Sequence, residues 1–383
     1  MPILLKKDIF RKIRTEEGIF DQMKISIILG TRPEIIKMSP IIRECEALGL
    51  DFFILHTGQH YSYNMDKVFF EQLKLPDVKY NLDIGSGSHA EQTGRMLIGI
   101  EKILHDEEPD VVLVEGDTNT VLAGAIASVK LGISVGHVEA GLRSYDRNMP
   151  EEINRILADH SSTFLFSPTE KSRKILLQEG IDKEKIFVTG NTVVDAVIQN
   201  LQLSKNNFSF LDKLNLESKN YFLVTIHRQE NVDNKTRFRK IMNGLNKVKK
   251  FGFEIIYPIH PRAKKQLELF GLQNEDVRLV EPLDYLSFLQ IEKNARLVFT
   301  DSGGVQEEAC ILGVPCVTLR DNTERPETLD VGANILAGVE PNEIFEKSKL
   351  MLQNLNLWNN PFGDGTAGKQ IIQLIMKKLG SKK

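Results

Sequence analysis

Carboxylate and arginine side chains gather in one stretch of the sequence, residues 136–155. Glu139 closes a short apolar run, and Pro150 then opens a segment of helical character in which Glu151 and Arg155 stand four residues apart. Proline suits the first position of a helix because its missing amide hydrogen would have no partner there, and residues four apart share one helix face. Carboxylates beside arginines are suited to acid and base chemistry on an anionic substrate. The alternative interpretation is a charged surface loop with solvated ion pairs.

A second candidate site combines glycines with a polar residue. Ser302, Gly303 and Gly304 follow a short apolar run, residues 296–300, and precede a helical segment. Glycines let the backbone approach a ligand closely, and the free amides at a helix N-terminus attract an anion, so a phosphate group is the expected guest. Neither a G-x-G-x-x-G after the first predicted strand nor a Walker A sequence is present, which removes the main support for NAD or ATP binding. The alternative is a glycine turn that only lets strand and helix pack.

Three cations extend the hypothesis of an anionic ligand. Arg32 and Lys37 flank the start of the first predicted helix, and Arg325 lies in a polar loop of the second half. Arginine binds phosphate oxygens bidentately, so a group of this kind suits a diphosphate. Taken singly, each of these residues is more often a surface charge.

The histidines carry weaker signals. His227 ends a predicted strand, where a histidine is as often structural as functional. His137 lies inside an apolar strand, and we expect it to be a hydrogen-bonded core residue, whereas His260 is either a ligand or a helix cap. Histidines and carboxylates show no short metal-ligand spacing, and Ser302 lacks the G-x-S-x-G of serine hydrolases. We therefore expect neither a metal site nor a serine hydrolase.

The elements that must position these residues alternate in type along the chain. Short apolar runs, typical of strands buried on both faces of a parallel sheet, are separated by helical segments of ten or more residues. This pattern predicts an α/β fold with doubly wound parallel sheets, and it restarts after a polar segment at residues 203–220, which indicates two Rossmann-like domains. The active site is expected in the cleft between them, beyond the carboxyl ends of the strands. The predicted strands are residues 24–30, 52–56, 111–115, 133–138, 163–167 and 186–189, then 221–226, 253–258, 277–281, 296–300, 315–319 and 333–336.

Composition excludes several classes of protein. The chain has 383 residues, of which 41% are hydrophobic and 26% charged, and its net charge is −3. These values are ordinary for a globular protein; no basic excess recommends a nucleic-acid partner, and no apolar run is long enough to span a bilayer. The three cysteines, Cys45, Cys310 and Cys316, are expected to be buried thiols in a reducing compartment, which makes the cytoplasm the expected location.

Seven blocks of sequence, in order, resemble the non-hydrolysing UDP-N-acetylglucosamine 2-epimerase family. The resemblance runs from Met23 to near the C-terminus, and the order of the blocks makes it far more specific than any single motif. The blocks are Gly30-Thr31-Arg32-Pro33-Glu34 with Lys37, Gly116-Asp117-Thr118, His137-Val138-Glu139-Ala140-Gly141-Leu142-Arg143, Pro150-Glu151-Glu152 with Asn154-Arg155, Thr225-Ile226-His227-Arg228, Asp301-Ser302-Gly303-Gly304 with Gln306-Glu307-Glu308, and Glu324-Arg325-Pro326-Glu327.

The resemblance implies a GT-B-like pair of Rossmann-like domains, a cytoplasmic homodimer and a UDP-sugar substrate. The implied isomerase reaction inverts C2 of UDP-GlcNAc to give UDP-ManNAc by anti elimination of UDP to 2-acetamidoglucal and re-addition, without nicotinamide, metal or other cofactor. The implied domains are 23–195, 196–365 for UDP binding, and a C-terminal helix in 366–383 that packs back on the first domain. Residues 1–22 are interpreted as a dispensable arm or the product of an upstream start codon.

The resemblance also assigns residues by matching position. It implies Asp117, Glu139 and Glu151 as acid/base candidates, and His227 beside the diphosphate. Phosphate contacts would come from Arg32, Ser302, Gly303 and Gly304, with Lys37 and Arg155 close by. Glu308 would take the ribose hydroxyls, Phe288 would face the uracil, and Arg325 would reach the sugar-phosphate region.

The chain departs from the family pattern in two places. Leu283 stands where bacterial members often carry Gln, and the loop after Gln59-His60, residues 61–65, differs from the bacterial loop that helps to bind a second, activating UDP-GlcNAc. The same loop, together with Tyr145-Asp146-Arg147-Asn148, resembles relatives that act on UDP-diacetamido-glucuronic acid. Alternatives are therefore epimerisation of such a modified substrate, hydrolysing epimerisation that releases ManNAc, a retaining glycosyltransferase, and a UDP-sugar-binding regulator.

Overall fold

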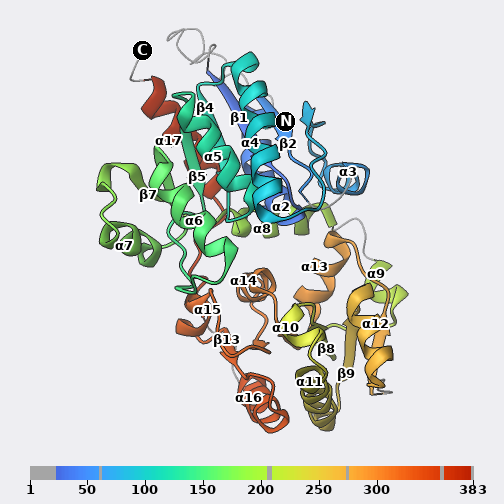
Figure 1. Ribbon diagram of the computed structural model, residues 1–383. Coiled ribbons are helices and arrows are strands. Elements are labelled where there is room, and N and C mark those ends of the chain that lie inside the picture. Colours follow the sequence, from blue (N-terminus) through green and yellow to red (C-terminus); the bar gives the residue numbers. More distant parts are fainter. Residues whose placement is uncertain (1–22, 60–62, 205–208, 273–275, 354–357, 381–383) are drawn as a thin grey trace, which may run out of the picture. The chain divides into compact units, whose positions relative to one another are not determined.

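The structure is a computed structural model that describes residues 23–59, 63–204, 209–272, 276–353 and 358–380 (Figure 1). The predicted arm at residues 1–22 and residues 60–62 of the loop after Gln59 lie outside this range. The chain divides into two compact units, one formed by the residues up to Ala196 together with Phe362 onward, the other by Val197–Pro361. Each unit is described by itself.

The first unit is built on a seven-stranded sheet in which every recorded pair is parallel, in the order β3-β2-β1-β4-β5-β6-β7. Ile25 of β1 pairs with both β2 and β4, so the order of connection reverses between β1 and β4. Ligands of doubly wound folds bind at this switch point, beyond the carboxyl ends of the strands. The strands are β1 Lys24–Leu29, β2 Asp51–His56, β3 Tyr80–Asn81, β4 Val111–Glu115, β5 Ser134–Val138, β6 Phe164–Ser167 and β7 Ile186–Val188.

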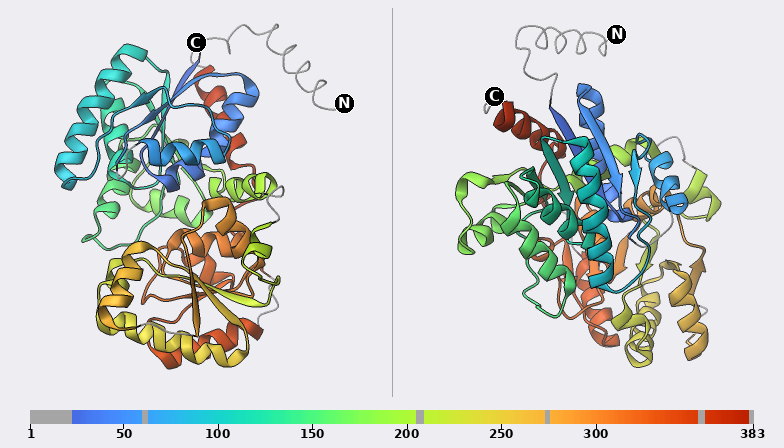
Figure 2. Two further views of the ribbon diagram at one scale, coloured as in Figure 1. Left: turned by 90° about the vertical axis from the view of Figure 1, so that its right-hand side faces the viewer. Right: turned by 45° about the horizontal axis from the view of Figure 1, so that its top comes forward.

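Helices cover both faces of this sheet (Figure 2). They are α2 Arg32–Leu48, α3 Tyr63–Gln72, α4 His89–Glu107, α5 Asn119–Lys130, α6 Pro150–Ser161, α7 Glu170–Gln178, α8 Thr192–Ser204 and α17 Ala367–Gly380. The last of them, α17, comes from the end of the chain and packs on α2. The two helices lie close together at Gly368, where an added Cβ would lie 3.1 Å from the backbone of Pro40. The carboxylate of Asp195 accepts the amide hydrogens of Ala367 and Gly368, which fixes the start of α17.

The second unit repeats the architecture with a six-stranded parallel sheet in the order β10-β9-β8-β11-β12-β13. Its switch point lies between β8 and β11, both of which are buried along most of their length. The strands are β8 Tyr221–Thr225, β9 Glu254–Pro258, β10 Val277–Val280, β11 Leu297–Thr300, β12 Cys316–Thr318 and β13 Asn334–Leu336. The helices are α9 Ser209–Lys213, α10 Gln229–Val232, α11 Lys235–Val248, α12 Pro261–Phe270, α13 Tyr285–Asn294, α14 Gly303–Ile311, α15 Pro326–Asp330 and α16 Pro341–Gln353.

The core of each unit explains why the strands read as continuous apolar runs. Residues of β8 and β11 such as Phe222, Val224 and Phe299 are buried, because helices cover both sides of the sheet. The three cysteines are free and buried, as predicted. Within the described ranges, every helix falls short of the length or the apolar character needed to cross a membrane.

The two predicted sheets are confirmed, and two local features differ from expectation. The strand β3 was not predicted, because Tyr80 and Asn81 are too few residues to give a periodic signal. The polar segment at 203–220 contains the short helix α9.

Candidate functional site

A partly buried lysine joins two buried carboxylates at the switch point of the first unit. Lys37, on the second turn of α2, forms ion pairs with Glu139 and with Glu115, whose Oε1 lies 3.1 Å from the lysine Nζ. Asn191 Nδ2 approaches Glu139 Oε2 at 3.3 Å. Glu139 has a φ of 69°, a left-handed backbone that is uncommon for a residue with a side chain and worth attention at a candidate site. Glu139 is thus held from two elements at the end of β5.

Asp117 follows β4, and its partly exposed side chain contacts buried residues of α6. Its carboxylate pairs with Arg155, which also binds Glu152 at 2.8 Å. Asn154 Nδ2 donates to the Asp117 carbonyl at 2.9 Å. The Asp117 side chain is 32% exposed, whereas those of Arg155 and Glu152 are 6% and 1% exposed. Because β4 and β5 are adjacent, Asp117 and Glu139 follow neighbouring strands.

Glu151 differs from its neighbour Glu152, although both open α6. The Glu152 carboxylate accepts the amides of Ser144 and Tyr145, each at 2.9 Å, and so anchors the loop before the helix. These bonds and Arg155 hold the pKa of Glu152 below its ordinary value, although burial opposes this. Across the described ranges, no ion pair or hydrogen bond engages the half-buried Glu151 carboxylate, which is compatible with contact to a substrate.

Arg32 is held by α3. Its Nε lies 3.3 Å from the buried Asp66, and its guanidinium stands 4.9 Å from the centre of the Phe69 ring. The preceding loop is closed by Glu34, which accepts the amide hydrogens of Gly30 at 2.5 Å and Thr31 at 2.9 Å. Burial raises the pKa of Glu34 to about 7.

His137 is a hydrogen-bonded core residue, as predicted. Its Nδ1 lies 2.7 Å from Asp159 and its Nε2 lies 2.8 Å from the carbonyl of Gly116. Both partners are acceptors, so the charged imidazolium satisfies both contacts. Burial opposes this charge, but the attraction of Asp159 raises the pKa of His137. Arg143 joins the same network through Asp159, at 2.7 Å, and Glu179.

In the second unit, the buried Asp301 orients the turn that follows β8. Its carboxylate accepts the amides of His227 and Arg228 and contacts His227 Nδ1 at 3.0 Å. Burial raises the pKa of Asp301, but these hydrogen bonds prevail and hold it below its ordinary value. The His227 side chain is about half exposed, so its ring is oriented by Asp301 and accessible to a ligand. His260 is resolved as a helix cap, because it accepts the amide of Arg262 at 3.3 Å.

Ser302, Gly303 and Gly304 form the start of α14. The Ser302 hydroxyl accepts the amide of Val305 at 3.5 Å, while the amides of Gly303 and Gly304 have no acceptor in the part of the chain that the structure describes. A Cβ added to Gly303 would lie 2.7 Å from Oε1 of Glu324. Because Arg228 and Arg320 hold this carboxylate, a side chain at position 303 would displace it from them. Free amides remain at the helix start to meet an anion.

Arginines surround the carboxylate beside this helix start. Glu324 accepts from Arg228 at 2.8 Å and from Arg320 at 2.7 Å. Burial raises the pKa of Glu324, but Arg325, Arg228 and Arg320 outweigh it and bring it to about 2. Arg325 is itself buried and lies 3.0 Å from Glu307. Three arginines therefore lie near the start of α14, and each of them pairs with a glutamate.

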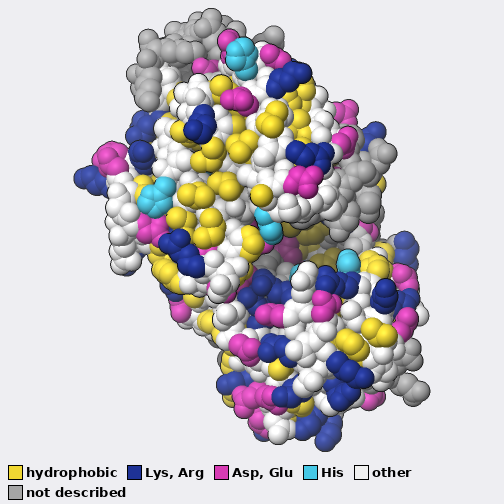
Figure 3. Space-filling view, viewed as in Figure 1, with side chains coloured by type: hydrophobic (Ala, Val, Ile, Leu, Met, Phe, Trp, Pro, Cys, Tyr) yellow, Lys and Arg dark blue, Asp and Glu magenta, His cyan; other side chains and the backbone are white. Residues whose placement is uncertain are grey.

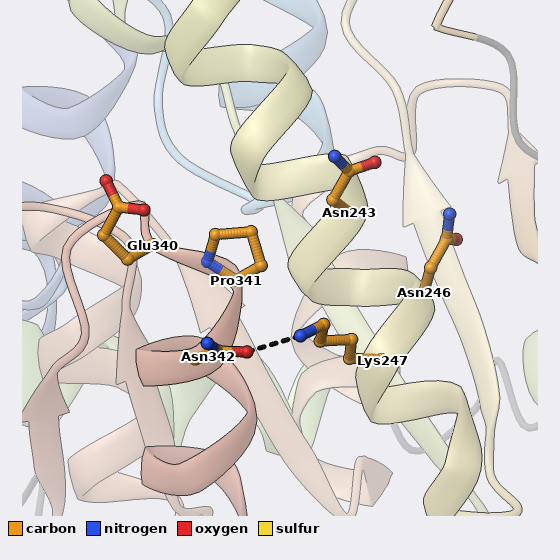
Figure 4. A pocket seen from close by; sticks show the side chains of 6 residues that line it. All are labelled: Asn243, Asn246, Lys247, Glu340, Pro341 and Asn342. Carbon is orange, nitrogen blue, oxygen red and sulfur yellow. Dashed lines mark hydrogen bonds between the residues drawn. The ribbon is translucent and has the colours of Figure 1, made fainter.

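The remaining predicted residues of the second unit lie on α13 and α14. Tyr285 donates its hydroxyl to Glu308 at 2.9 Å, and both side chains are buried. Burial and Glu308 raise the pKa of Tyr285, which remains a donor. Phe288 and Leu283 are partly buried and pack against the apolar core. A pocket between α11 and α16 is lined by other residues (Figure 4): Asn243, Asn246, Lys247, Glu340, Pro341 and Asn342.

The structure brings Asp117, Glu139, Lys37 and Arg155 together in the first unit, and it gathers the glycines and Arg325 in the second. Sequence reasoning gave no role to Glu34, Glu115 and Glu152. The Thr31-x-x-Glu34 spacing of a capping box is a usable signal for Glu34, and a charged residue at the end of the run VVLVE is one for Glu115.

Comparison with known proteins adds an independent finding. A family model described as UDP-N-acetylglucosamine 2-epimerase matches residues 43–376. The chain is 57% identical to a UDP-N-acetylglucosamine 2-epimerase of Methanocaldococcus jannaschii over 362 residues, 92% of this chain and 99% of that protein.

Solved and more distant relatives agree with this match. A crystal structure of Methanocaldococcus jannaschii UDP-GlcNAc 2-epimerase in complex with UDP-GlcNAc and UDP is similar with a TM-score of 0.85 at 57% identity, and the match covers 93% of this chain and all of that one. A UDP-2,3-diacetamido-2,3-dideoxy-D-glucuronate 2-epimerase of Pseudomonas aeruginosa is 40% identical over 93% of this chain and 100% of that protein.

Proposed function

The chain belongs to the UDP-N-acetylglucosamine 2-epimerase family, and from this we propose that it is an isomerase that interconverts UDP-GlcNAc and UDP-ManNAc. The observation that carries the proposal is the pair of carboxylates at neighbouring strand ends, Asp117 and Glu139, which are ion-paired to the buried Arg155 and the partly buried Lys37, respectively. Such a pair can remove a proton from one face of C2 and return one to the other. An acid/base group of this kind must lie within hydrogen-bond distance of the substrate and must have a suitable protonation state.

The proposed reaction has two half-steps. One carboxylate takes the C2 proton, the C–H electron pair becomes the C1–C2 double bond of 2-acetamidoglucal, and UDP leaves with the electrons of the C1–O bond. UDP then adds back to C1 while a carboxylic acid protonates C2 from the opposite face. Asp117, Glu139 and Glu151 are the proposed acid/base groups. Lys37 and Arg155 pair with Glu139 and Asp117 and hold these two carboxylates in place.

Stabilising the departing diphosphate is the second requirement, since the C2 proton is only weakly acidic. We assign this role in the second unit to Ser302, to the amides of Gly303 and Gly304, to Arg325, and to His227, which Asp301 orients. Fixed donors of this kind gain in strength where water is excluded. Arg32, Lys37 and Arg155 are the proposed cations of the first unit, Glu308 the proposed partner of the ribose hydroxyls, and Phe288 that of the uracil.

Proton NMR of the purified protein with UDP-GlcNAc tests the proposal. We expect a new anomeric signal of UDP-ManNAc that grows until the reaction reaches equilibrium. When the reaction starts from UDP-ManNAc, we expect the anomeric signal of UDP-GlcNAc to appear. Release of free ManNAc would show a hydrolysing enzyme. No change with UDP-GlcNAc, together with turnover of UDP-diacetamido-glucuronic acid, would contradict the proposed substrate. UDP-GlcNAc is favoured because the chain is 57% identical to the Methanocaldococcus jannaschii epimerase and 40% identical to the Pseudomonas aeruginosa one.

We also propose that the chain forms a homodimer through an apolar face of the first unit. Figure 3 shows hydrophobic side chains grouped over α4, α5 and α6, which pack side by side. Ile98 is 73% exposed, Leu157 44% and Val129 40%, and Leu122 and Ile126 are partly exposed between them. Contiguous exposed apolar surface on a folded protein marks an interaction site. A second copy of the chain presents the same surface and is the proposed occupant.

The three buried free thiols support the cytoplasm as the proposed location.

Analytical ultracentrifugation of charged variants tests the dimer. Val129→Lys combined with Leu157→Lys should shift the protein from twice the chain mass to the chain mass. Leu269→Lys, at a 70% exposed position on α12 of the second unit, is the matched control and should remain a dimer. A monomeric wild type, or a dimer that survives the double substitution, would contradict the proposed face.

A further inference from the structure

Glu115 is a buried carboxylate at the candidate site to which the proposed reaction gives no role. It ends β4, immediately before Gly116 and Asp117, and its side chain is 2% exposed. Its recorded ion pair in the described ranges is with Lys37, the same lysine that pairs with Glu139. Lys37 is therefore shared between Glu115 and a proposed acid/base group.

Among the ion pairs that the structure describes here, negative charges outnumber positive ones if every group is ionised. One ammonium faces two carboxylates, and Glu34, also buried, acts on Glu115 from α2. An unbalanced buried negative charge is costly, so the cluster retains a proton at neutral pH.

The contacts indicate which carboxylate keeps that proton. Glu139 has Lys37 and also the amide of Asn191 as donors that favour its ionised form, whereas Glu115 relies on Lys37. Burial raises the pKa of Glu115 well above its ordinary value; Lys37 lowers it, and Glu139 and Glu34 raise it further. The deeper member of the pair is thus the neutral acid.

We propose that Glu115 is a positioning residue whose protonated form leaves Lys37 to Glu139, so that Glu139 stays ionised and oriented for proton transfer at C2. This inference rests on the proposed epimerase function. When rising pH removes the proton of Glu115, the new carboxylate competes for Lys37 and places a second negative charge beside Glu139. Lys37 and Glu34 from α2, and Glu139 from the end of β5, are the charged groups that act on Glu115. Activity should therefore fall on the alkaline side as Glu115 ionises.

The pH dependence of kcat for UDP-GlcNAc, compared between wild type and Glu115→Gln, tests this role. Glutamine copies the neutral acid, so we expect kcat near pH 7 to stay within about 3-fold of wild type and the alkaline limb to move up by about 1 pH unit or more. KM should change little, since Glu115 does not touch the substrate. Glu107→Gln is the matched control: it removes a glutamate that pairs with Lys24 and Lys79, and the profile should not move.

Two outcomes would overturn the inference. A Glu115→Gln profile that superimposes on wild type would show that Glu115 does not set the alkaline limb. A loss of kcat of about 100-fold at pH 7 in a folded variant would show that the ionised carboxylate is needed. Glu115→Met supplies a second neutral side chain if glutamine impairs folding, and it should shift the limb in the same direction. Absence of turnover in the wild type would instead count against the proposed function.

Discussion

The two units share one architecture but begin their key helices differently. In the first unit, the Glu34 carboxylate turns back over the start of α2 and accepts the amides of Gly30 and Thr31, the two residues that precede the helix. In the second unit, α14 begins with Gly303 and Gly304, whose amides have no acceptor in the described ranges. A helix start closed by its own carboxylate does not attract phosphate, whereas one with free amides does. The helix start with free amides therefore lies in the second unit, within the residues that the structure describes.

The ion pairs show the same division. In the first unit, Lys37 is shared between two carboxylates, and buried carboxyl groups keep raised pKa values. In the second unit, arginines converge on Glu324 and lower its pKa to about 2, although burial acts in the opposite sense. A buried acid suits proton transfer, and arginines that converge on one point suit a diphosphate. This difference supports the proposal that the first unit carries the chemistry and the second unit binds the nucleotide.

The largest expected effect comes from the acid/base pair of the first unit. Asp117→Asn or Glu139→Gln should lower kcat by about 10²- to 10⁴-fold, the usual contribution of general acid or base catalysis. UDP affinity by calorimetry should change less than about 3-fold, because the second unit supplies most of the nucleotide contacts. Glu107→Gln serves as the control for loss of a paired carboxylate. If UDP binding fell in parallel with kcat, the division of labour between the units would be wrong.

Glu34 gives a prediction on stability. Its pKa is about 7 in the folded protein against an ordinary 4.5, so the folded state prefers the proton. The stabilisation is therefore complete below pH 4.5 and is lost as pH rises through about 7, a change of about 3 kcal/mol. Urea unfolding between pH 4.5 and 8.5 should show this decline in wild type and a flatter profile in Glu34→Gln. Parallel profiles would mean that Glu34 is ionised throughout.

The two glycines at the start of α14 separate packing from ligand binding. An added Cβ meets Glu324 at 2.7 Å at Gly303, but its nearest neighbour at Gly304 is 3.9 Å away. Gly303→Ala should lower the melting temperature, and Gly304→Ala should not. Both should weaken UDP binding by about 10-fold, because a methyl group obstructs the approach to the amides. Unchanged UDP affinity in Gly304→Ala would leave close packing as the reason for the glycines.

The smallest expected effect concerns the ribose contact. Tyr285→Phe removes the hydroxyl that donates to Glu308 at 2.9 Å, a bond worth about 1 kcal/mol. UDP should bind about 5-fold more weakly, while uracil alone should bind as it does to wild type. If UDP and uracil both bound more weakly by the same factor, the substitution would act on the contact between Phe288 and the base instead of on the ribose contact.

The sequence predicted the sheets because their strands are long enough to read as apolar runs, and strand ends located most candidate residues. The sequence could not predict the contacts that depend on the direction in which a side chain points. Glu151 and Glu152 are both within reach of Arg155 by spacing, but packing turns Glu152 toward the arginine and the Ser144 amide. Glu115, at the end of the buried strand β4, pairs with Lys37, which lies 78 positions earlier by the residue numbers, and no local pattern encodes such a contact. His260 became a cap only when α12 placed an amide beside it.

The central claim is that first-unit carboxylates exchange the C2 proton of a UDP-sugar with solvent. Turnover of UDP-GlcNAc in heavy water, followed by NMR and mass spectrometry, tests it most directly. We expect UDP-ManNAc with deuterium at C2, and a loss of deuterium incorporation in Asp117→Asn and Glu139→Gln. Product that retains the original hydrogen at C2, or full incorporation in both variants, would contradict the account.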